Sequence, residues 1–188
     1  MNDSPCILII PGSARTGSWN VKLAHAAAGR LATLGAQATV IDLRALQLPI
    51  YDGDLEAASG IPVGATTLVG QFALHDAVLV VSPEYNAHPT PLFINAIDWA
   101  TRLPEHRAAM NGEPTALLGA SPGALGGLRS LLVLRNFLSI NPGMLVLPQQ
   151  YALSQAHEAF ATDGSLKDAR QQAMLDGVLS ALVKAAQT

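Results

Sequence analysis

Residues 12–20 form a glycine-containing segment that directly follows a short apolar run. Gly12 and Gly17 let the backbone turn tightly, and a helix that begins next to the segment would direct free N–H groups at it. The side chains able to donate hydrogen bonds to an anion are those of Ser13, Arg15, Thr16, Ser18 and Asn20. Arg15 adds a fixed positive charge suited to bidentate contact with phosphate. These features predict an anion site at a helix N-terminus.

The spacing within this segment narrows the kind of phosphate that it would bind. No Lys follows Gly17, and the segment does not match the G-x-G-x-x-G pattern. ATP hydrolysis and dinucleotide binding in the Rossmann manner are therefore disfavoured, whereas a phosphomonoester such as that of FMN suits the segment. The alternative is an ordinary strand–helix turn with Ser18 as the N-cap.

A second polar segment, residues 82–91, contains three prolines within nine residues. Prolines stiffen a loop, so its backbone N–H groups can be held against a planar ligand at low entropic cost. Tyr85 and Asn86 would add a ring and an amide to a wall that fits a flat ligand with polar edges. A proline-stiffened connection without a ligand is the alternative. His88 is a conceivable general base, but an inert loop histidine is the simpler interpretation.

A third segment, residues 120–129, has Gly123, Gly126 and Gly127 within five residues. Glycines at these positions let a ligand or another stretch of backbone approach closely. A plain loop is again the alternative. Arg129 and Arg135, which follow the glycines, are expected to be solvent-facing or interfacial.

The three segments need a scaffold that brings them together. Short apolar runs predict strands at residues 6–10, 38–43, 77–82, 115–120 and 144–147. Helical spacing of apolar residues predicts helices at residues 23–34, 63–75, 91–101, 126–140 and 165–187. This alternation predicts one α/β domain over residues 1–188, with a parallel sheet between two helical layers. Ligands of such sheets bind outside the carboxyl ends of the strands, where all three segments lie. Residues 44–62 and 149–164 are expected to be irregular.

Composition excludes several other functions. The formal net charge is -3 and only 11 residues are Lys or Arg, which argues against nucleic acid as a partner. Cys6 is the only cysteine, so neither an internal disulfide nor a thiolate metal cluster is expected, and a reducing cytoplasm fits. No apolar run approaches the roughly 20 residues of a spanning helix, and the residues before Cys6, Asp3 among them, do not resemble a secretory signal.

Taken together, the three segments resemble the NADPH-dependent FMN reductase family, which includes quinone, chromate and azo-dye reductases. Residues 12–20 read GSARTGSWN against the family form GSxRxxSxN. Residues 83–99 read PEYNAHPTPLFINAIDW against PEYNxSxPxxLKNAIDW, and residues 121–129 read SPGALGGLR against SxGxxGGxR. The chain departs from the second motif at His88, Phe93 and Ile94, where Ser, Leu and Lys are usual. These changes concern the acceptor side of the pocket and the subunit contact.

The resemblance implies a flavodoxin-like three-layer sandwich, with five parallel strands in the order 2-1-3-4-5 and non-covalently bound FMN. The residues that it places around the FMN phosphate are Ser13, Arg15, Ser18 and Asn20, with Trp19 beside them. It places Pro83, Glu84, Tyr85 and Asn86 along the flavin ring. Ser121 and Gly123 would lie near the pyrimidine side of that ring. No catalytic acid or base and no metal ligand is predicted.

The implied activity is transfer of electrons from NADPH or NADH, through FMN, to flavin, a quinone or a similar small acceptor. The implied assembly is a homodimer or homotetramer, with neither membrane nor nucleic acid as a partner. Two alternatives stay open from the residues: an electron carrier of the flavodoxin type, and a flavin-binding redox sensor with little turnover. Arg102 and Arg107 are candidates for contact with the 2′-phosphate of NADPH.

Overall fold

The computed structural model describes residues 4–188 and contains a five-stranded parallel sheet with the strand order β2-β1-β3-β4-β5. The strands are β1 (Cys6–Pro11), β2 (Gln37–Val40), β3 (Ala77–Val81), β4 (Pro114–Ala120) and β5 (Leu145–Leu153). The predicted fold class and strand order are confirmed. The expectation about a secretory signal falls partly on residues 1–3, which lie outside the described residues.

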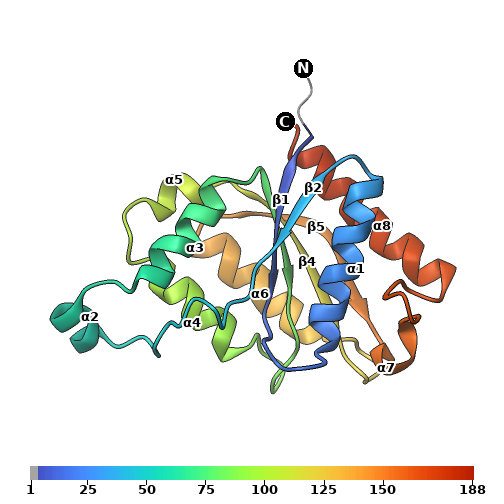
Figure 1. Ribbon diagram of the computed structural model, residues 1–188, viewed down its shortest axis with the longest axis horizontal. Coiled ribbons are helices and arrows are strands. Elements are labelled where there is room, and N and C mark those ends of the chain that lie inside the picture. Colours follow the sequence, from blue (N-terminus) through green and yellow to red (C-terminus); the bar gives the residue numbers. More distant parts are fainter. Residues whose placement is uncertain (1–3) are drawn as a thin grey trace.

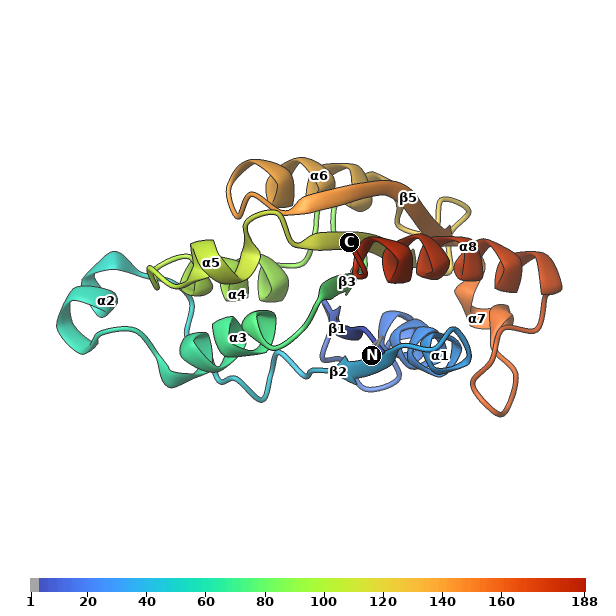
Figure 2. The ribbon, with the colours of Figure 1, turned by 90° about the horizontal axis from the view of Figure 1, so that it is seen from above.

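Helices cover both faces of the sheet, as Figures 1 and 2 show. The long helices are α1 (Trp19–Thr33), α3 (Val63–Ala73), α4 (Pro91–Ala100), α6 (Leu128–Ile140) and α8 (Ala169–Ala185), and the short ones are α2 (Gly53–Ser59), α5 (His106–Met110) and α7 (Ala156–Ala159). Helices α1 and α8 lie on one face, while α3, α4 and α6 lie on the other (Figure 2). Within residues 4–188 no helix is both long and apolar enough to cross a bilayer.

The sheet is buried on both faces because successive side chains of a strand point in opposite directions. In β1, Ile7 and Ile9 belong to the core beneath α1 and α8, whereas Leu8 and Ile10 belong to the core on the other face. All four side chains are at most 1% exposed. The nearly continuous apolar runs that predicted the strands are thus a direct consequence of their double coverage.

Strand β5 differs from the prediction, which ended it at residue 147. It continues to Leu153, with a register irregularity opposite the Thr115–Leu117 stretch of β4. Pro148 and the polar residues after it interrupt the apolar pattern, which an edge strand tolerates. Arg135 on α6 holds this stretch, because its guanidinium donates to the carbonyl oxygens of Val146 and Leu147 at 3.2 and 2.6 Å. A cross-element contact therefore extends the strand.

Residues 44–62, expected to be irregular, include the short helix α2, which has no buried residue and projects from the body of the molecule (Figure 1). Arg102 binds the carboxylate of Glu56 on α2 at 2.9 Å. The indole N–H of Trp99 donates to the carbonyl oxygen of Pro49 at 2.8 Å.

Helix α6 begins at Leu128, later than predicted, because Gly126 and Gly127 have φ of 61° and 93° and cannot continue a right-handed helix.

Candidate functional site

The loops after β1, β3 and β4 meet where the carboxyl ends of these strands converge, at the lower edge of the sheet in Figure 1. They enclose a cavity of about 150 Å³, hereafter the cofactor cavity. Its lining residues are Ser13, Arg15, Ser18, Trp19, Asn20, Pro83, Glu84, Tyr85, Ala120, Ser121 and Pro122. The structure thus brings together all the predicted site residues except Asn86 and Gly123, which lie in the same loops but do not line the cavity.

The loop after β1 presents hydrogen-bond donors at the start of α1. Ser18 is the N-cap, and its hydroxyl oxygen accepts from the N–H of Val21 at 3.4 Å. The N–H groups of Trp19 and Asn20, in the first turn, have no acceptor among residues 4–188. Arg15 is exposed and anchored lightly, by one hydrogen bond to the carbonyl oxygen of Thr16 at 3.2 Å. A helix N-terminus with free N–H groups and a nearby guanidinium is suited to an anion.

Asn20 links this loop to the end of β4. Its amide nitrogen donates to the carbonyl oxygen of Ala120, and its amide oxygen accepts from the Ala120 N–H, both at 2.9 Å and both buried. The Asn20 side chain therefore sets the spacing of two walls of the cofactor cavity. The second N–H of the side-chain amide and the backbone N–H of Asn20 are left to face an anion, so the direct contact with phosphate stays a prediction.

A second link joins the loop after β1 to α4. Thr90 is the N-cap of α4, and its hydroxyl donates to the carbonyl oxygen of Gly12 at 2.6 Å. A Cβ atom on Gly12 would lie 3.2 Å from the hydroxyl oxygen of Ser82, so this close approach favours glycine. No role was predicted for Thr90 from the sequence. A Thr immediately before Pro91 is nevertheless a recognisable helix-start signal.

The loop after β3 forms a tight turn. Tyr85 and His88 exchange two backbone hydrogen bonds, at 2.9 and 3.0 Å, across Asn86 and Ala87. Both central residues have positive φ, 53° and 64°, as in a type I′ turn. The turn holds Tyr85, which is 50% exposed, at the mouth of the cofactor cavity. His88 is exposed, and its ring Nδ1 lies 3.1 Å from the carbonyl oxygen of Asn86.

Glu84 is held by the helix that follows the third loop. Arg129 forms an ion pair with its carboxylate, with Nε 2.7 Å from Oε1. The N–H of Ser130 reaches the other oxygen at 3.4 Å. Helix α6 has no side-chain N-cap of its own, since Gly127 occupies that position. Glu84 therefore supplies the negative charge that a helix N-terminus favours. Arg129, expected to be solvent-facing or interfacial, is 60% exposed and in addition supports the site through this ion pair.

The loop after β4 completes the cofactor cavity. The hydroxyl oxygen of Ser121 accepts from the N–H of Gly123 at 3.1 Å. At Gly126 an added Cβ atom would lie 2.6 Å from the carbonyl carbon of Ala152 on β5, and the residue has positive φ. A side chain at position 126 would therefore clash with the backbone of β5.

The arrangement fits FMN in its chemistry. Free N–H groups and Arg15 match a phosphate, and the loops after β3 and β4 border a space into which a ring edge can fit. The cavity is smaller than the roughly 300–1,000 Å³ of typical ligand pockets, so part of a bound flavin would extend beyond it.

Comparison with known proteins decides the family. A sequence profile described as NADPH-dependent FMN reductase matches residues 5–158. The chain belongs to this family. As a member of the NADPH-dependent FMN reductase family it is an oxidoreductase that uses FMN and NAD(P)H. The resemblance deduced from the three loop motifs is thereby confirmed.

Individual relatives agree with the family assignment. An NAD(P)H-dependent FMN reductase of Pseudomonas aeruginosa is 34% identical over 185 residues, covering 97% of this chain and 95% of that protein. A quinone reductase of Escherichia coli is 31% identical over 146 residues, covering 78% and 76% of the two chains. The solved structure of FerB, a flavoenzyme NAD(P)H:(acceptor) oxidoreductase from Paracoccus denitrificans, matches with a TM-score of 0.84 and 31% identity, covering 97% of each chain.

Proposed function

We propose that the chain binds FMN with its phosphate on residues 13–20 and transfers electrons from NAD(P)H to a quinone or a similar small acceptor. The observation that carries the proposal is the cofactor cavity itself. One space is lined by the anion-binding loop after β1 and by the loops after β3 and β4. A phosphate and a flat ring joined to it need these two surfaces side by side.

Bound FMN would supply the redox chemistry, by accepting a hydride and releasing one or two electrons. The residues of this chain would bind and orient it. Arg15 and the first-turn N–H groups of α1 would hold the phosphate, while Asn20 fixes the distance between two walls. Glu84, anchored by Arg129, would hold the backbone of the loop after β3 along the ring. No side chain is assigned as a general acid or base.

A small apolar acceptor is the substrate that we propose. Only part of a flavin fits into the cofactor cavity, so the rest would stay accessible to donor and acceptor in turn. The similar protein of Escherichia coli is named a quinone reductase, and FerB is named an NAD(P)H:(acceptor) oxidoreductase. Alternating access of donor and acceptor to one open face predicts ping-pong kinetics.

We also propose that the chain forms a homodimer or homotetramer. Ile50 is 86% exposed, and Leu48, Leu92 and Ile94 border the same hollow of about 430 Å³. Burial raises the pKa of Asp98 at the edge of this hollow. Leu48, Leu92 and Ile94 are half-buried, and a hollow lined by partly exposed apolar side chains is typical of a subunit contact. Light scattering of the purified protein measures the assembly, and a monomer at micromolar concentration would contradict this part of the proposal.

The experiment that tests cofactor and site together is a flavin titration of Arg15→Ala. One charge-assisted hydrogen bond is worth about 1.5–3 kcal/mol, so FMN affinity should fall by at least roughly tenfold. Arg170→Ala, at an exposed position on α8, is the control and should bind FMN as the wild type does. The bound flavin of the wild type should lose its visible absorption with NADPH and regain it with benzoquinone. Equal FMN affinity of the wild type and both variants would show that the FMN phosphate does not bind to this loop.

A further inference from the structure

A separate cavity, of about 430 Å³, lies between α1, α8 and residues 160–165 and is hereafter called the lateral cavity. It shares no lining residue with the cofactor cavity, and no function assigned so far uses it. Its volume falls within the range of typical ligand pockets. Helix α1 contributes residues spaced three and four positions apart, and therefore on one face of the helix, namely Lys22, His25, Ala26, Gly29 and Arg30.

The outer wall of the lateral cavity is a hairpin, residues 160–166, that the fold itself holds closed. Phe160 and Leu166 form an antiparallel bridge, and the N–H of Ala161 donates to the carbonyl oxygen of Ser165 at 2.8 Å. Leu166 is buried in the core beneath α1 and α8 and so anchors the hairpin. Because the wall is formed without a ligand, little ordering entropy is lost when a ligand binds to it.

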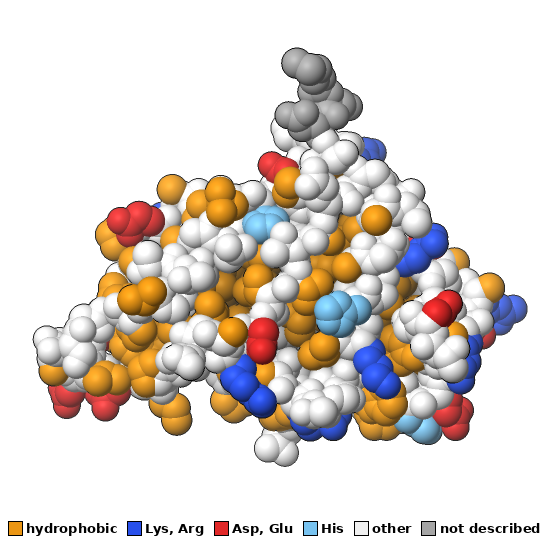
Figure 3. Space-filling view, viewed as in Figure 1, with side chains coloured by type: hydrophobic (Ala, Val, Ile, Leu, Met, Phe, Trp, Pro, Cys, Tyr) orange, Lys and Arg blue, Asp and Glu red, His pale blue; other side chains and the backbone are white. Residues whose placement is uncertain are grey.

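One end of the lateral cavity is aromatic and its floor is apolar. The ring of Phe160 stacks on that of Trp19, with centroids 6.1 Å apart and planes within 7°, and it also borders the cavity. Ala26 and Gly29 form the floor, and none of residues 4–188 would place an atom within 4 Å of a Cβ atom on Gly29. Figure 3 shows apolar atoms on the right of the front face with charged side chains around them. A flat ring can lie on this floor.

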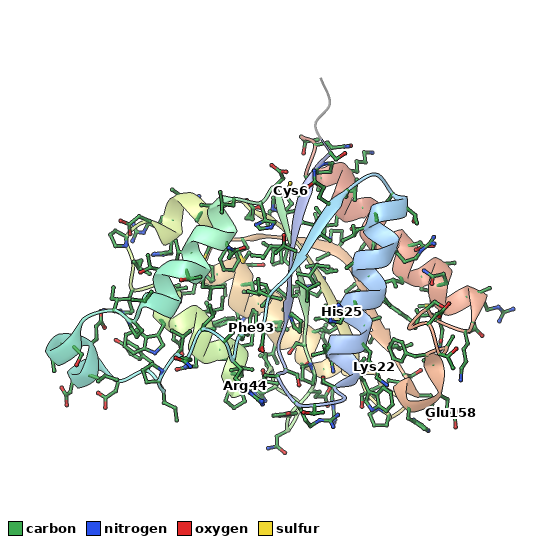
Figure 4. The ribbon with its side chains drawn as sticks, in the orientation of Figure 1. Cys6, Lys22, His25, Arg44, Phe93 and Glu158 are labelled. Atoms are coloured by element: carbon green, nitrogen blue, oxygen red, sulfur yellow. The ribbon has the colours of Figure 1, made fainter. Side chains whose placement is uncertain are left out.

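The α1 wall of the lateral cavity is positively charged. Figure 4 places Lys22 and His25 along the lower half of α1. The Lys22 ammonium lies over the Trp19 ring, 4.5 Å from its centroid, and forms no ion pair within the described part of the chain. The Nε and Nη2 atoms of Arg30 donate to Asp176 at 2.9 and 2.8 Å, so its charge is already matched. Lys22 is therefore the cation on this wall that an anionic ligand would meet.

The hairpin wall carries the opposite charge. The Oδ1 atom of Asp163 accepts from the hydroxyl and the N–H of Ser165, at 2.7 and 3.0 Å. These two hydrogen bonds lower the pKa of Asp163, so the carboxylate is ionised at neutral pH. Its Oδ2 atom has no hydrogen-bond or ion-pair partner among residues 4–188. The charges of Lys22 and Asp163 thus border one cavity without meeting each other.

We propose that the lateral cavity binds a flat aromatic acid that also carries a ring hydroxyl. The ring would pack on Ala26 and Gly29, with its edge against Phe160. The carboxylate would accept from the Lys22 ammonium, and the hydroxyl would donate to Asp163. A ligand with only one of these two groups would leave one wall unused and should bind more weakly. The inference does not depend on the proposed function, because the lateral cavity lies outside the cofactor cavity.

The test is a calorimetric titration, in excess FMN, with 6-hydroxy-2-naphthoate, whose acid and hydroxyl lie at opposite ends of two fused rings. The wild type should bind it at submillimolar concentration. Lys22→Gln should weaken binding about tenfold, which corresponds to the loss of one charge-assisted hydrogen bond, and Asp163→Asn should weaken it several-fold. Lys184→Gln, at an exposed position on α8, is the control and should bind as the wild type does.

Gly29→Leu tests the location because its side chain would occupy the open space of the lateral cavity. It should abolish binding of the naphthoate. Urea denaturation should show this variant to be at least as stable as the wild type, since glycine is unfavourable inside a helix. Binding that survives in Gly29→Leu, or that perturbs the visible spectrum of FMN, would place the ligand at the flavin and overturn the proposal.

Two shortened ligands test which wall holds which group. 2-Naphthoate lacks the hydroxyl, so Asp163→Asn should leave its affinity unchanged. 2-Naphthol lacks the acid, so Lys22→Gln should leave its affinity unchanged. Equal losses with every ligand, or no binding of 6-hydroxy-2-naphthoate at millimolar concentration, would overturn the proposal. If FMN itself failed to bind, the proposed function would fall, whereas the titrations of the Lys22, Asp163 and Gly29 variants would still decide the lateral cavity.

Discussion

The side-chain amide of Asn20 makes two buried hydrogen bonds, each 2.9 Å long, with the backbone N–H and carbonyl oxygen of Ala120. The two residues lie 100 positions apart in the chain. They join the start of α1 to the end of β4, which are two of the three walls of the cofactor cavity. A single side chain therefore couples the stability of the fold to the geometry of the site.

Replacing Asn20 by Ala should lower both the stability of the fold and the FMN affinity of the site. Two buried backbone groups of Ala120 would lose their partners, at about 1–3 kcal/mol each, so the free energy of unfolding should fall by about 3 kcal/mol. FMN affinity should fall with it because the cavity walls are no longer held at a fixed distance. Urea denaturation and flavin titration measure the two effects. Asn141→Ala, at the exposed end of α6, should change neither quantity, and an Asn20→Ala protein as stable as wild type would disprove the coupling.

Arg129→Ala should weaken FMN binding more than it weakens the fold. The Arg129 side chain is 60% exposed, so the ion pair contributes about 1 kcal/mol or less to stability. The Glu84 side chain is only 9% exposed, and without its partner the loop after β3 should shift and FMN affinity should drop several-fold. Arg102→Ala removes a comparable ion pair, with Glu56, away from the cofactor cavity. If both variants bind FMN equally well, Glu84 does not depend on Arg129 for its position.

Ala87→Gly should stabilise the protein. Ala87 has φ of 64°, where an L-residue with a Cβ atom costs about 1–2 kcal/mol, whereas glycine loses about 0.5–1 kcal/mol of chain entropy on folding. The balance favours glycine by about 0.5–1 kcal/mol, measured as a higher urea midpoint. The same change at Ala58, inside the exposed helix α2, should destabilise by a similar amount. Opposite signs at the two positions are the expected result, and equal signs would show that the turn is not strained.

Glu113 should make stability depend on pH. Burial raises its pKa to about 7, from an ordinary value of 4.5, and the nearby charge of Asp76 adds to the rise. Its Oε1 is buried and has no hydrogen-bond partner among the described residues, 4–188. Since the folded state holds this proton more tightly than the unfolded state, stability should fall as the pH rises from about 4.5 to 7 and stay lower above that.

Glu113→Gln isolates this effect because it keeps the shape of the side chain and removes the titration. The stability advantage of the wild type over the variant should shrink by about 1–2 kcal/mol across that pH range, after allowance for partial solvent exposure. Thermal denaturation at a series of pH values measures the difference. Glu105→Gln, at an exposed position, should leave the profile unchanged. If the stability of the wild type and of Glu113→Gln changed in parallel with pH, Glu113 would not titrate in this pH range as proposed.

The order of short apolar runs and amphipathic stretches determined the fold class, because strands covered on both faces must be continuously apolar. It also determined where the candidate site lies, since every loop that follows a parallel strand emerges at the same edge of the sheet. Residue types within residues 12–20 then indicated phosphate, because glycines, hydroxyls and Arg15 act locally and their chemistry does not depend on distant partners.

Only the tertiary structure decided what each polar side chain contacts. For Asn20 the sequence predicted contact with a phosphate, which stays a prediction, but it did not predict the two hydrogen bonds to Ala120, on a strand that sheet pairing brings next to α1. Arg129 was expected to be solvent-facing or interfacial, and its side chain is 60% exposed, but its ion pair with Glu84, 45 positions earlier in the chain, was not predicted. Sequence patterns report neighbours along the chain, whereas these contacts depend on strand order and helix packing, which place remote residues within hydrogen-bonding distance.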